Sequence, residues 1–417
     1  MPQTKQMFGS VAFCMLLVMN SWNARAEEEG DADAVSVQTH GFISQGLLKS
    51  ERNNVFEGTK DGTFQFNEFG LTFLTDLFEQ LHAGIQLFSR DLGDLGNNEV
   101  TLDWAFGDYR WRDWLGIRLG KIKIPYGLYN ETRDVDMFRA SIFLPSSIYY
   151  EGERDKLNTL IGGGLYGNVS AGSFGALSYH LQIGDANVES GSGDVKYAQN
   201  ENSAVTEMQI DRQYTADLEW ETPLEGLKLG AFAMQSDLTI TTTATTTETT
   251  SATTTTMATD ANQTPLEATD GASSENASPP APDDSRQFYI FSAEYSRGDA
   301  VMSGEYLCPS DSRAPEGYYL GAAYRLKDRY EFGAYYSVFY AHSRDKDGKK
   351  REHHGGKDYS AWQKEWVASV RVDLNKYWTI KAEGHLIDGT AQILTADNSE
   401  GMKRDSYLFA LKTTYHF

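Results

Sequence analysis

The sequence contains almost no cysteine, and it has no long apolar segment after Gly30. The only cysteines among its 417 residues are Cys14 and Cys308. Cys14 lies within an N-terminal apolar run, so the rest of the chain has a single thiol and cannot form an internal disulfide. A helix needs about 20 consecutive apolar residues to span a bilayer. The chain after Gly30 is therefore not a helical membrane protein.

The N-terminal segment is organised like a signal peptide. Lys5 supplies a positive charge, Phe8–Met19 is apolar, and Ala24-Arg25-Ala26 provides a small-x-small cleavage site. The alternative, a transmembrane helix, is disfavoured because the run is too short and acidic residues follow it directly. We predict that residues 1–26 are a signal peptide and that the exported mature chain, residues 27–417, begins near Glu27.

Positive charge is also scarce, whereas aromatic residues and glycine are abundant. The sequence has 37 Lys and Arg against 59 Asp and Glu, a net charge of −22. Such a chain repels phosphates, which excludes nucleic acid as a partner. The 23 Tyr, 21 Phe, 8 Trp and 38 Gly suit a membrane β-barrel, whose strands meet the two membrane interfaces with aromatic belts.

Strict alternation of apolar and polar residues is the main structural signal. In the last segment Tyr407, Phe409 and Leu411 fall on one face, and Ala410 and Lys412 fall on the other. A strand of a soluble sandwich also alternates, but here the apolar face begins and ends in aromatic residues, as a lipid-facing strand does. The same pattern recurs along the chain. It predicts strands near residues 35–48, 63–75, 80–90, 99–109, 113–124, 157–168, 173–184, 212–221, 226–238, 286–296, 300–308, 316–326, 329–342, 359–374, 376–388 and 404–417.

The connections between these sixteen segments alternate between tight and long. Short periplasmic turns alternating with long outer loops are typical of outer-membrane barrels, and an even strand number lets both chain ends lie on the periplasmic side. We therefore predict an all-β protein, a transmembrane antiparallel β-barrel of about sixteen strands with periplasmic termini. A barrel of this size leaves an aqueous channel.

Two of the predicted outer loops are unusual in composition. Residues 239–285 are rich in Thr, then in Pro and Ala, and predict a disordered extracellular segment; a glycosylated loop or one that phages and antibodies recognise is the alternative. The third loop, Pro125 to Lys156, is too aromatic for a solvated loop, with Tyr126, Phe143 and Tyr149 among its residues. We expect it to fold into the lumen and pack against the wall.

The cleaved signal, the sixteen strands, the folded third loop and the terminal Phe417 together resemble the bacterial general porins and their phosphate-selective relatives. The stretch from Gly116 to Asn130, which contains Pro125-Tyr126-Gly127, looks like a segment of uncharacterised proteobacterial porins. The Pro-Glu-Phe-Gly motif that many enteric porins carry in the third loop is missing, so the resemblance does not extend to the shape of the constriction.

The resemblance implies a passive outer-membrane channel for small hydrophilic solutes, surrounded by outer-membrane lipids and assembled as a homotrimer. It also implies that the third loop forms the constriction and that the barrel-assembly machinery recognises Phe417. Selectivity would then come from charged side chains that line the pore. Our candidates for the pore lining and the constriction are Arg118, Lys121, Lys123, Arg133, Asp134, Asp136, Arg139, Glu151, Glu153, Arg154, Glu68, Arg90 and Asp103.

Two arrangements of these charges are open. In one, the basic wall residues Arg118, Lys121 and Lys123 face the acidic residues of the third loop across the channel and set up a transverse field. In the other, the loop acids pair with the loop's own bases and hold its shape. Acids outnumber bases among the residues that alternation turns inward, which favours a weakly cation-preferring pore. A substrate-specific channel of the anion or phosphate type, and a surface-display or adhesion barrel, are the alternatives.

No catalytic, metal or cofactor site stands out. Gly162, Gly164 and Gly167 match a dinucleotide-binding pattern, but a turn follows where that motif needs a helix. Asp345 and Asp347 resemble the start of a calcium loop that lacks its final Glu. No Ser/His/Asp set is apparent. We therefore predict neither an enzyme nor a bound cofactor.

Overall fold

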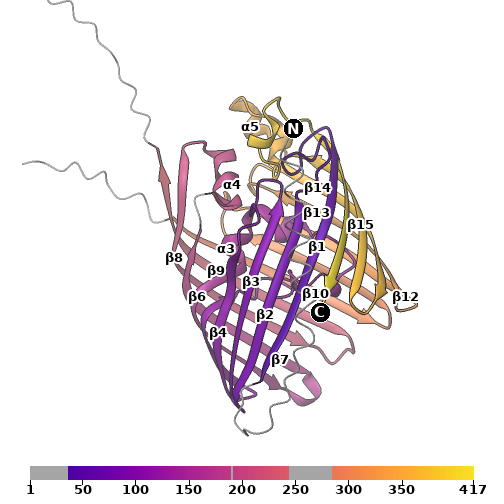
Figure 1. Cartoon of the computed structure of the whole chain (residues 1–417). Helices are drawn as coiled ribbons and strands as arrows, with labels where there is room; N and C mark the ends of the chain where they lie inside the picture. The colour runs from indigo at the N-terminus through magenta and orange to yellow at the C-terminus, as the bar shows by residue number, and fades with distance from the viewer. Residues whose placement is uncertain (1–35, 189–190, 244–283) are drawn as a thin grey trace, which may run out of the picture. The chain divides into compact units, whose positions relative to one another are not determined.

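The computed structural model describes residues 36–188, 191–243 and 284–417, and in these ranges the chain forms a β-barrel (Figure 1). Its strands are β1 (Val37–Glu51), β2 (Phe66–Phe78), β3 (Leu81–Leu92), β4 (Thr101–Arg112), β5 (Leu115–Lys123), β6 (Thr159–Ser170), β7 (Ala176–Asn187), β8 (Val205–Glu221), β9 (Leu227–Thr242), β10 (Asp284–Arg297), β11 (Ala300–Pro309), β12 (Glu316–Leu326), β13 (Tyr330–Tyr340), β14 (Trp362–Asn375), β15 (Trp378–Gly389) and β16 (Asp405–His416). The predicted signal peptide lies outside the described residues, and so does the predicted Thr-rich loop from residue 244 to residue 283.

Each strand pairs antiparallel with its neighbours in sequence, and β1 pairs with β16 to close the ring. The last residue completes this seam, because Gly41 and Phe417 each donate a backbone N–H to the other's carbonyl oxygen at 3.0 Å. Closure gives every strand two partners and leaves no edge strand. The predicted closed antiparallel barrel of sixteen strands is confirmed.

Side chains alternate between the two faces of the wall as the sequence predicts. In β16, Tyr407 and Phe409 are 40% and 47% exposed, whereas Ala410 and Lys412 are buried. The exposed side chains of the other strands are likewise mostly apolar, and the opposite face carries many polar and charged groups. An apolar outer face with a polar inner face is the pattern of a barrel that is surrounded by lipid and encloses water.

The connections differ at the two ends of the barrel. The end that holds Val37 and Phe417, here the turn end, has short connections such as Lys327–Arg329. Lys327 and Asp328 both adopt positive φ, 55° and 52°, as the twist of a tight hairpin requires. The opposite end, here the loop end, carries the long connections and includes the helices α4 (Gly193–Glu201) and α5 (Lys349–His353) (Figure 1).

Short helices occur within the connections. They are η2 (Asp136–Phe138), α2 (Ser146–Tyr149), η3 (Glu151–Glu153), α3 (Arg154–Asn158), η4 (Gly172–Phe174), α4 (Gly193–Glu201), α5 (Lys349–His353), η5 (Asp358–Ala361) and η6 (Ala396–Asn398). None of the helices in the described ranges is long and apolar enough to cross a membrane.

Two strand boundaries, the start of β8 and the end of β9, differ clearly from the prediction. β8 begins at Val205, well before the predicted start at residue 212, and β9 continues to Thr242, inside the predicted Thr-rich loop. The pairing of β8 with β9 shifts register between Val205 and Glu207 and again between Ile210 and Arg212. A bulge adds a residue to one strand and so interrupts the alternation on which the prediction relied.

The apolar outer face yields a stability prediction. Leu320 lies in the middle of β12 and is 64% exposed. We expect Leu320→Arg to lower the free energy of unfolding of the barrel in phospholipid vesicles by about 2–4 kcal/mol, because a lipid-facing base is costly there. Denaturant titration of the refolded protein measures this difference. Glu99→Arg, in the exposed connection between β3 and β4, is the control; equal effects of the two substitutions would contradict a lipid-facing β12.

Candidate functional site

The connection between β5 and β6, residues 124–158 and here called loop 3, contacts the inner face of the wall through two apolar anchors. Near its start, Tyr126 makes edge contacts with Phe232 of β9 and Phe288 of β10, and the ring centroids are 5.5 and 5.7 Å apart. In its middle Phe143 stacks on Phe66 of β2 at 5.4 Å. The aromatic residues that make loop 3 unusual in sequence thus pack against strands far apart around the barrel.

Asp136 is the polar anchor in the middle of loop 3. Its carboxylate lies 2.8 Å from Nζ of Lys412 and 3.6 Å from Nζ of Lys381, and it accepts a hydrogen bond from the Thr414 hydroxyl at 2.7 Å. Lys381 also donates to the carbonyl oxygens of Asp136 and Ser141, at 2.7 and 2.9 Å. Burial alone would raise the pKa of the Asp136 carboxyl, but Lys381, Lys412 and Arg139 outweigh it and hold that pKa well below its usual range.

A carboxylate of the wall binds the backbone of the same loop segment. Glu383 of β15 accepts the N–H groups of Ile142 and Phe143 at 2.6 and 3.1 Å. Its oxygen Oε1 is also 2.9 Å from Nε2 of His385, which lies 3.6 Å from Glu365. Alternation turns Glu383 and Glu365 inward, but the sequence contains no signal that Glu383 binds Ile142 and Phe143, which lie more than two hundred residues away.

The ends of loop 3 are joined to the wall by a compact network of charges. Asp134 lies 2.5 Å from Nζ of Lys123 and 2.7 Å from the Arg154 guanidinium. The same two bases reach Asp103 of β4, at 3.3 and 3.4 Å. Burial would raise the pKa of the Asp134 carboxyl, but Arg154 and Lys123 hold it well below its usual range.

Glu151 links the loop to β3. Its carboxylate contacts Arg90 at 2.8 Å and Arg133 of the loop itself at 3.1 Å. Despite burial, Arg133 and Arg90 lower the pKa of the Glu151 carboxyl. Three other candidates are also paired. Glu153 contacts Lys156, and Glu68 contacts Lys412. Arg139 contacts the Asp136 carboxylate and donates a hydrogen bond to the carbonyl oxygen of Arg133.

Of the two charge arrangements that the sequence left open, the contacts agree with the second, in which the loop acids are paired and hold the loop's shape, and bases of the wall take part in this pairing. Asp134, Asp136 and Glu151 each contact at least one base of the wall and one base of the loop. The wall bases and loop acids meet at hydrogen-bonding distance, not across a channel. Their first effect is to hold the loop against the wall.

The carboxylate of Glu305, on the barrel wall, explains why residue 127 in the Gly116–Asn130 stretch is glycine. Glu305 of β11 accepts hydrogen bonds from the Leu128 N–H at 2.9 Å and from the hydroxyl of Tyr149 at 2.6 Å. Gly127 has a φ of +62°, and a Cβ there would lie 2.4 Å from Oε1 of Glu305. Only glycine allows both this backbone conformation and this approach.

The basic wall predicted on β5 is split between two faces. Arg118 points inward and pairs with Asp108 of β4 at 2.6 Å, which also accepts the Tyr166 hydroxyl at 2.5 Å. Lys121, in contrast, is in register with Ile161, whose side chain is 51% exposed, so it lies on the outer face. The prediction that Lys121 lines the pore is wrong, because three positions separate it from Arg118 and alternation puts them on opposite faces.

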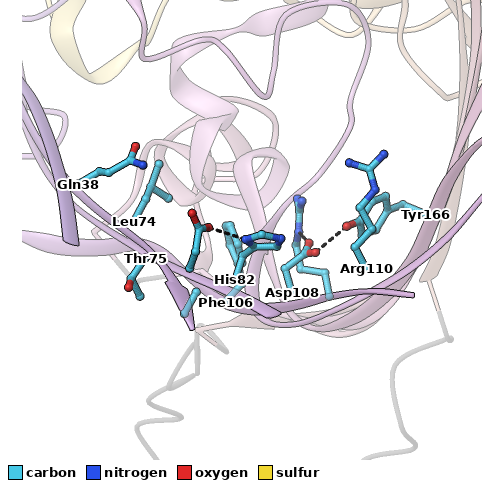
Figure 2. A pocket seen from close by; sticks show the side chains of 11 residues that line it. Gln38, Leu74, Thr75, His82, Phe106, Asp108, Arg110 and Tyr166 are labelled. Atoms are coloured by element: carbon cyan, nitrogen blue, oxygen red, sulfur yellow. Dashed lines mark hydrogen bonds and ion pairs between the residues drawn. The ribbon is translucent and has the colours of Figure 1, made fainter. Parts of the chain in front are cut away.

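Arg118 belongs to a cavity of about 300 Å³ near the turn end. Figure 2 shows its side chains pointing from the wall into the barrel, among them His82, Asp108 and Arg110. Met137 and Phe138 of loop 3 line a second cavity in the described part of the chain. It has a volume of about 480 Å³ and also includes Arg325 and Arg371.

Comparison with known proteins supports the fold. No protein-family model and no curated protein matches the sequence. Among solved structures, the chain is similar to OmpF of Salmonella typhi in complex with daunomycin, with a TM-score of 0.54 at 13% identity over 94% of this chain and 100% of that one. It is also similar to an anion-selective porin from Comamonas acidovorans, with a TM-score of 0.53 at 12% identity over 92% and 100%. The outer-membrane channel DcaP of Acinetobacter baumannii gives 0.52 at 10% identity over 93% and 99%. The structural neighbours are outer-membrane porins, and at these identities the likeness is one of fold.

The buried contacts of Asp136 predict a strong dependence of loop 3 on this residue. Asp136→Ala leaves Lys381 and Lys412 buried without their shared carboxylate, which costs about 3–5 kcal/mol. We expect loop 3 to become sensitive to limited proteolysis and the free energy of unfolding to fall. Asp155→Ala is the matched control, because Asp155 lies in the same loop and is exposed.

The sign of the pH dependence follows from the depressed pKa of the Asp136 carboxyl. A depressed carboxyl stabilises the folded state above its ordinary pKa of 3.8, and that contribution is lost only as pH falls through the lower folded value. Loop 3 of the unmodified chain should thus resist proteolysis at about pH 5 as well as at about pH 7. Proteolysis of loop 3 at about pH 5 would contradict the depressed pKa of the Asp136 carboxyl.

Proposed function

We propose that this chain forms an outer-membrane porin through which small hydrophilic solutes and ions diffuse passively. The observation that carries the proposal is the closed ring of sixteen strands with an apolar outer face and a polar inner face. Such a wall is stable in lipid, because every strand has two partners, and it is wide enough for an aqueous lumen.

The orientation follows from the connections. In outer-membrane barrels the short turns face the periplasm and the long loops face outward. The turn end, with Val37 and Phe417, would then be periplasmic, after removal of the signal peptide at residues 1–26. We propose further that Phe417 is recognised by the barrel-assembly machinery and that the protein is a homotrimer, as the resemblance to porins implies.

Loop 3 is proposed as the constriction. It contacts β2, β9, β11 and β15, which lie far apart around the ring, and a segment with such contacts occupies part of the lumen cross-section. Because Asp134, Asp136 and Glu151 are neutralised by direct contact, they do little to select ions. The lumen charges that loop 3 leaves uncovered would dominate selectivity.

Several of these uncovered inner-face charges lie on β4 and on β7 to β9. Asp108 there contacts Arg118, Asp217 contacts His180 at 3.4 Å, and Glu219 contacts Lys228 at 3.0 Å. Acids are at least as numerous as fixed positive charges in this region, and the whole chain carries −22. This favours a weak preference for cations.

Two alternatives remain distinct from a general pore. One solved neighbour is an anion-selective porin, and a specific channel of that type would need a basic lumen. A surface-display or adhesion barrel would use the Thr-rich loop predicted at residues 239–285. An enzyme is not proposed, because no nucleophile with a base and an orienting acid was found in the sequence.

Conductance in a planar bilayer tests the proposal. We expect the refolded mature chain to give discrete, large conductance steps, and a salt gradient to give a reversal potential of the cation-selective sign. A potential of the opposite sign would favour the anion-specific channel. Absence of steps from protein whose folding is verified by circular dichroism would contradict the porin and favour surface display.

The two faces of β5 provide a matched pair of variants for selectivity. Arg118→Ala removes an inward base and leaves the charge of the Asp108 carboxylate without its ion-pair partner, so we expect the reversal potential to shift toward stronger cation preference. Lys121→Ala removes the same charge from the outer face and should leave the potential unchanged. An unchanged potential in Arg118→Ala would exclude this residue from the conducting path.

A further inference from the structure

The helix α4 in the connection between β7 and β8 is fixed at its base by an apolar cluster. Val195 of α4 packs with Val205, Met208 and Ile210, residues of the part of β8 that the sequence did not predict. Ser192 caps the helix by accepting the Val195 N–H at 3.4 Å. The extended β8–β9 hairpin thus forms a platform beyond the predicted strands, and α4 begins on it.

From this base α4 makes polar contacts with two further connections, a quarter and half of the ring away. Nζ of Lys196 lies 2.5 Å from the carboxylate of Asp94, between β3 and β4, and 2.9 Å from its carbonyl oxygen. The Asn200 side chain donates to the carbonyl oxygen of Ile393 at 3.1 Å and accepts the Thr395 N–H at 2.9 Å. Ile393 and Thr395 lie between β15 and β16, half of the ring away from β7 and β8. The two connections therefore meet over the opening at the loop end.

The lower side of α4 rests on loop 3. Tyr197 makes an edge contact with Tyr150, with ring centroids 5.2 Å apart. Gly193 lies so close to Gly152 that a Cβ would come within 2.5 Å of its carbonyl oxygen. Asp194 accepts the Lys156 N–H at 3.3 Å. Loop 3 and α4 are thus stacked, one above the other, along the axis of the barrel.

These contacts carry an inference that rests on the proposed porin function. We propose that α4 is a strap across the opening at the loop end, and that it determines the largest solute able to enter, with Lys196 and Asn200 as the residues that hold its far side. The strap and loop 3 then act as two successive restrictions.

The chemistry of the contacts indicates that the far side of the strap can be released. The base is apolar and buried, whereas the far side is held by one ion pair and three hydrogen bonds of partly exposed side chains. Contacts of this kind exchange readily with water. On the underside of the helix, Oδ1 of the buried Asp194 has no hydrogen bond among the described residues and lies 3.7 Å from Nζ of Lys156, and burial raises the pKa of this carboxyl to about 7. The contact between α4 and loop 3 at Asp194 is therefore not one that would hold α4 permanently across the opening.

Liposome swelling with neutral sugars of increasing size tests the strap. The probes are arabinose and raffinose, and the variant is Lys196→Ala with Asn200→Ala, in the full mature chain. We expect the rate for raffinose relative to arabinose to rise severalfold in the variant, while the arabinose rate changes little. Neutral probes separate the effect from changes in charge.

The control is Gln199→Ala, because Gln199 is exposed in the same helix and, among the described residues, its side chain donates a hydrogen bond only to the carbonyl oxygen of Val205 at the base of α4. Lys196→Met with Asn200→Leu repeats the test with side chains of similar size, and circular dichroism and heat-dependent gel mobility verify folding of each protein. The strap proposal is wrong if the raffinose-to-arabinose rate ratio of both double variants equals that of the unmodified chain. Arabinose uptake by the unmodified chain shows that the porin itself is intact in that case. If liposomes with the unmodified chain take up no arabinose either, the proposed porin function itself is refuted.

Discussion

The seam between β1 and β16 is the constraint on which the rest of the structure depends. These strands are the two ends of the described barrel, and their pairing from Phe42–His416 to Glu51–Tyr407, extended by the Gly41–Phe417 backbone bonds, converts a sheet into a ring. In lipid an unpaired strand edge would leave a row of N–H and C=O groups without partners, each costing several kcal/mol. Closure removes that cost at once for all strands. It also fixes which face of each strand is inside, because a change of register by one residue would turn every side chain over.

A polar inner face then creates the conditions for loop 3. Side chains such as Lys381, Lys412 and Glu383 are buried, and buried charges are tolerated only when they are paired or hydrogen-bonded. Loop 3 supplies the missing groups: the Asp136 carboxylate, the carbonyl oxygen of Ser141 and the N–H groups of Ile142 and Phe143. Buried ion pairs add little net stability compared with apolar packing, but separating their members is costly. Their main effect here is to define one position of the loop.

The sequence predicts local regularities and misses contacts between distant segments. All sixteen strands are predicted because alternation is a local pattern with a period of two residues. The start of β8 is missed because bulges near Val205 and Ile210 interrupt that period. Lys121 is misplaced because it was grouped with Arg118 by proximity, although strict alternation would have separated them. The pairing of Asp136 with Lys381 was not predictable, since nothing in one segment specifies its partner 245 residues away. The same holds for α4, whose contacts with Asp94 and Thr395 join residues that are 102 and 195 positions apart.

The two elements inside and above the lumen are held by different kinds of interaction, and this difference has a physical consequence. Loop 3 is anchored by buried rings and by fully buried charges, so moving it requires desolvated groups to lose their partners. The far side of α4 is anchored by half-exposed polar groups, whose partners water can replace at small cost. The free energy of displacement is therefore expected to be large for loop 3 and small for α4. In the channel proposed above, the deeper restriction would set a constant minimum width, and the outer one would be the element whose position responds to the solute.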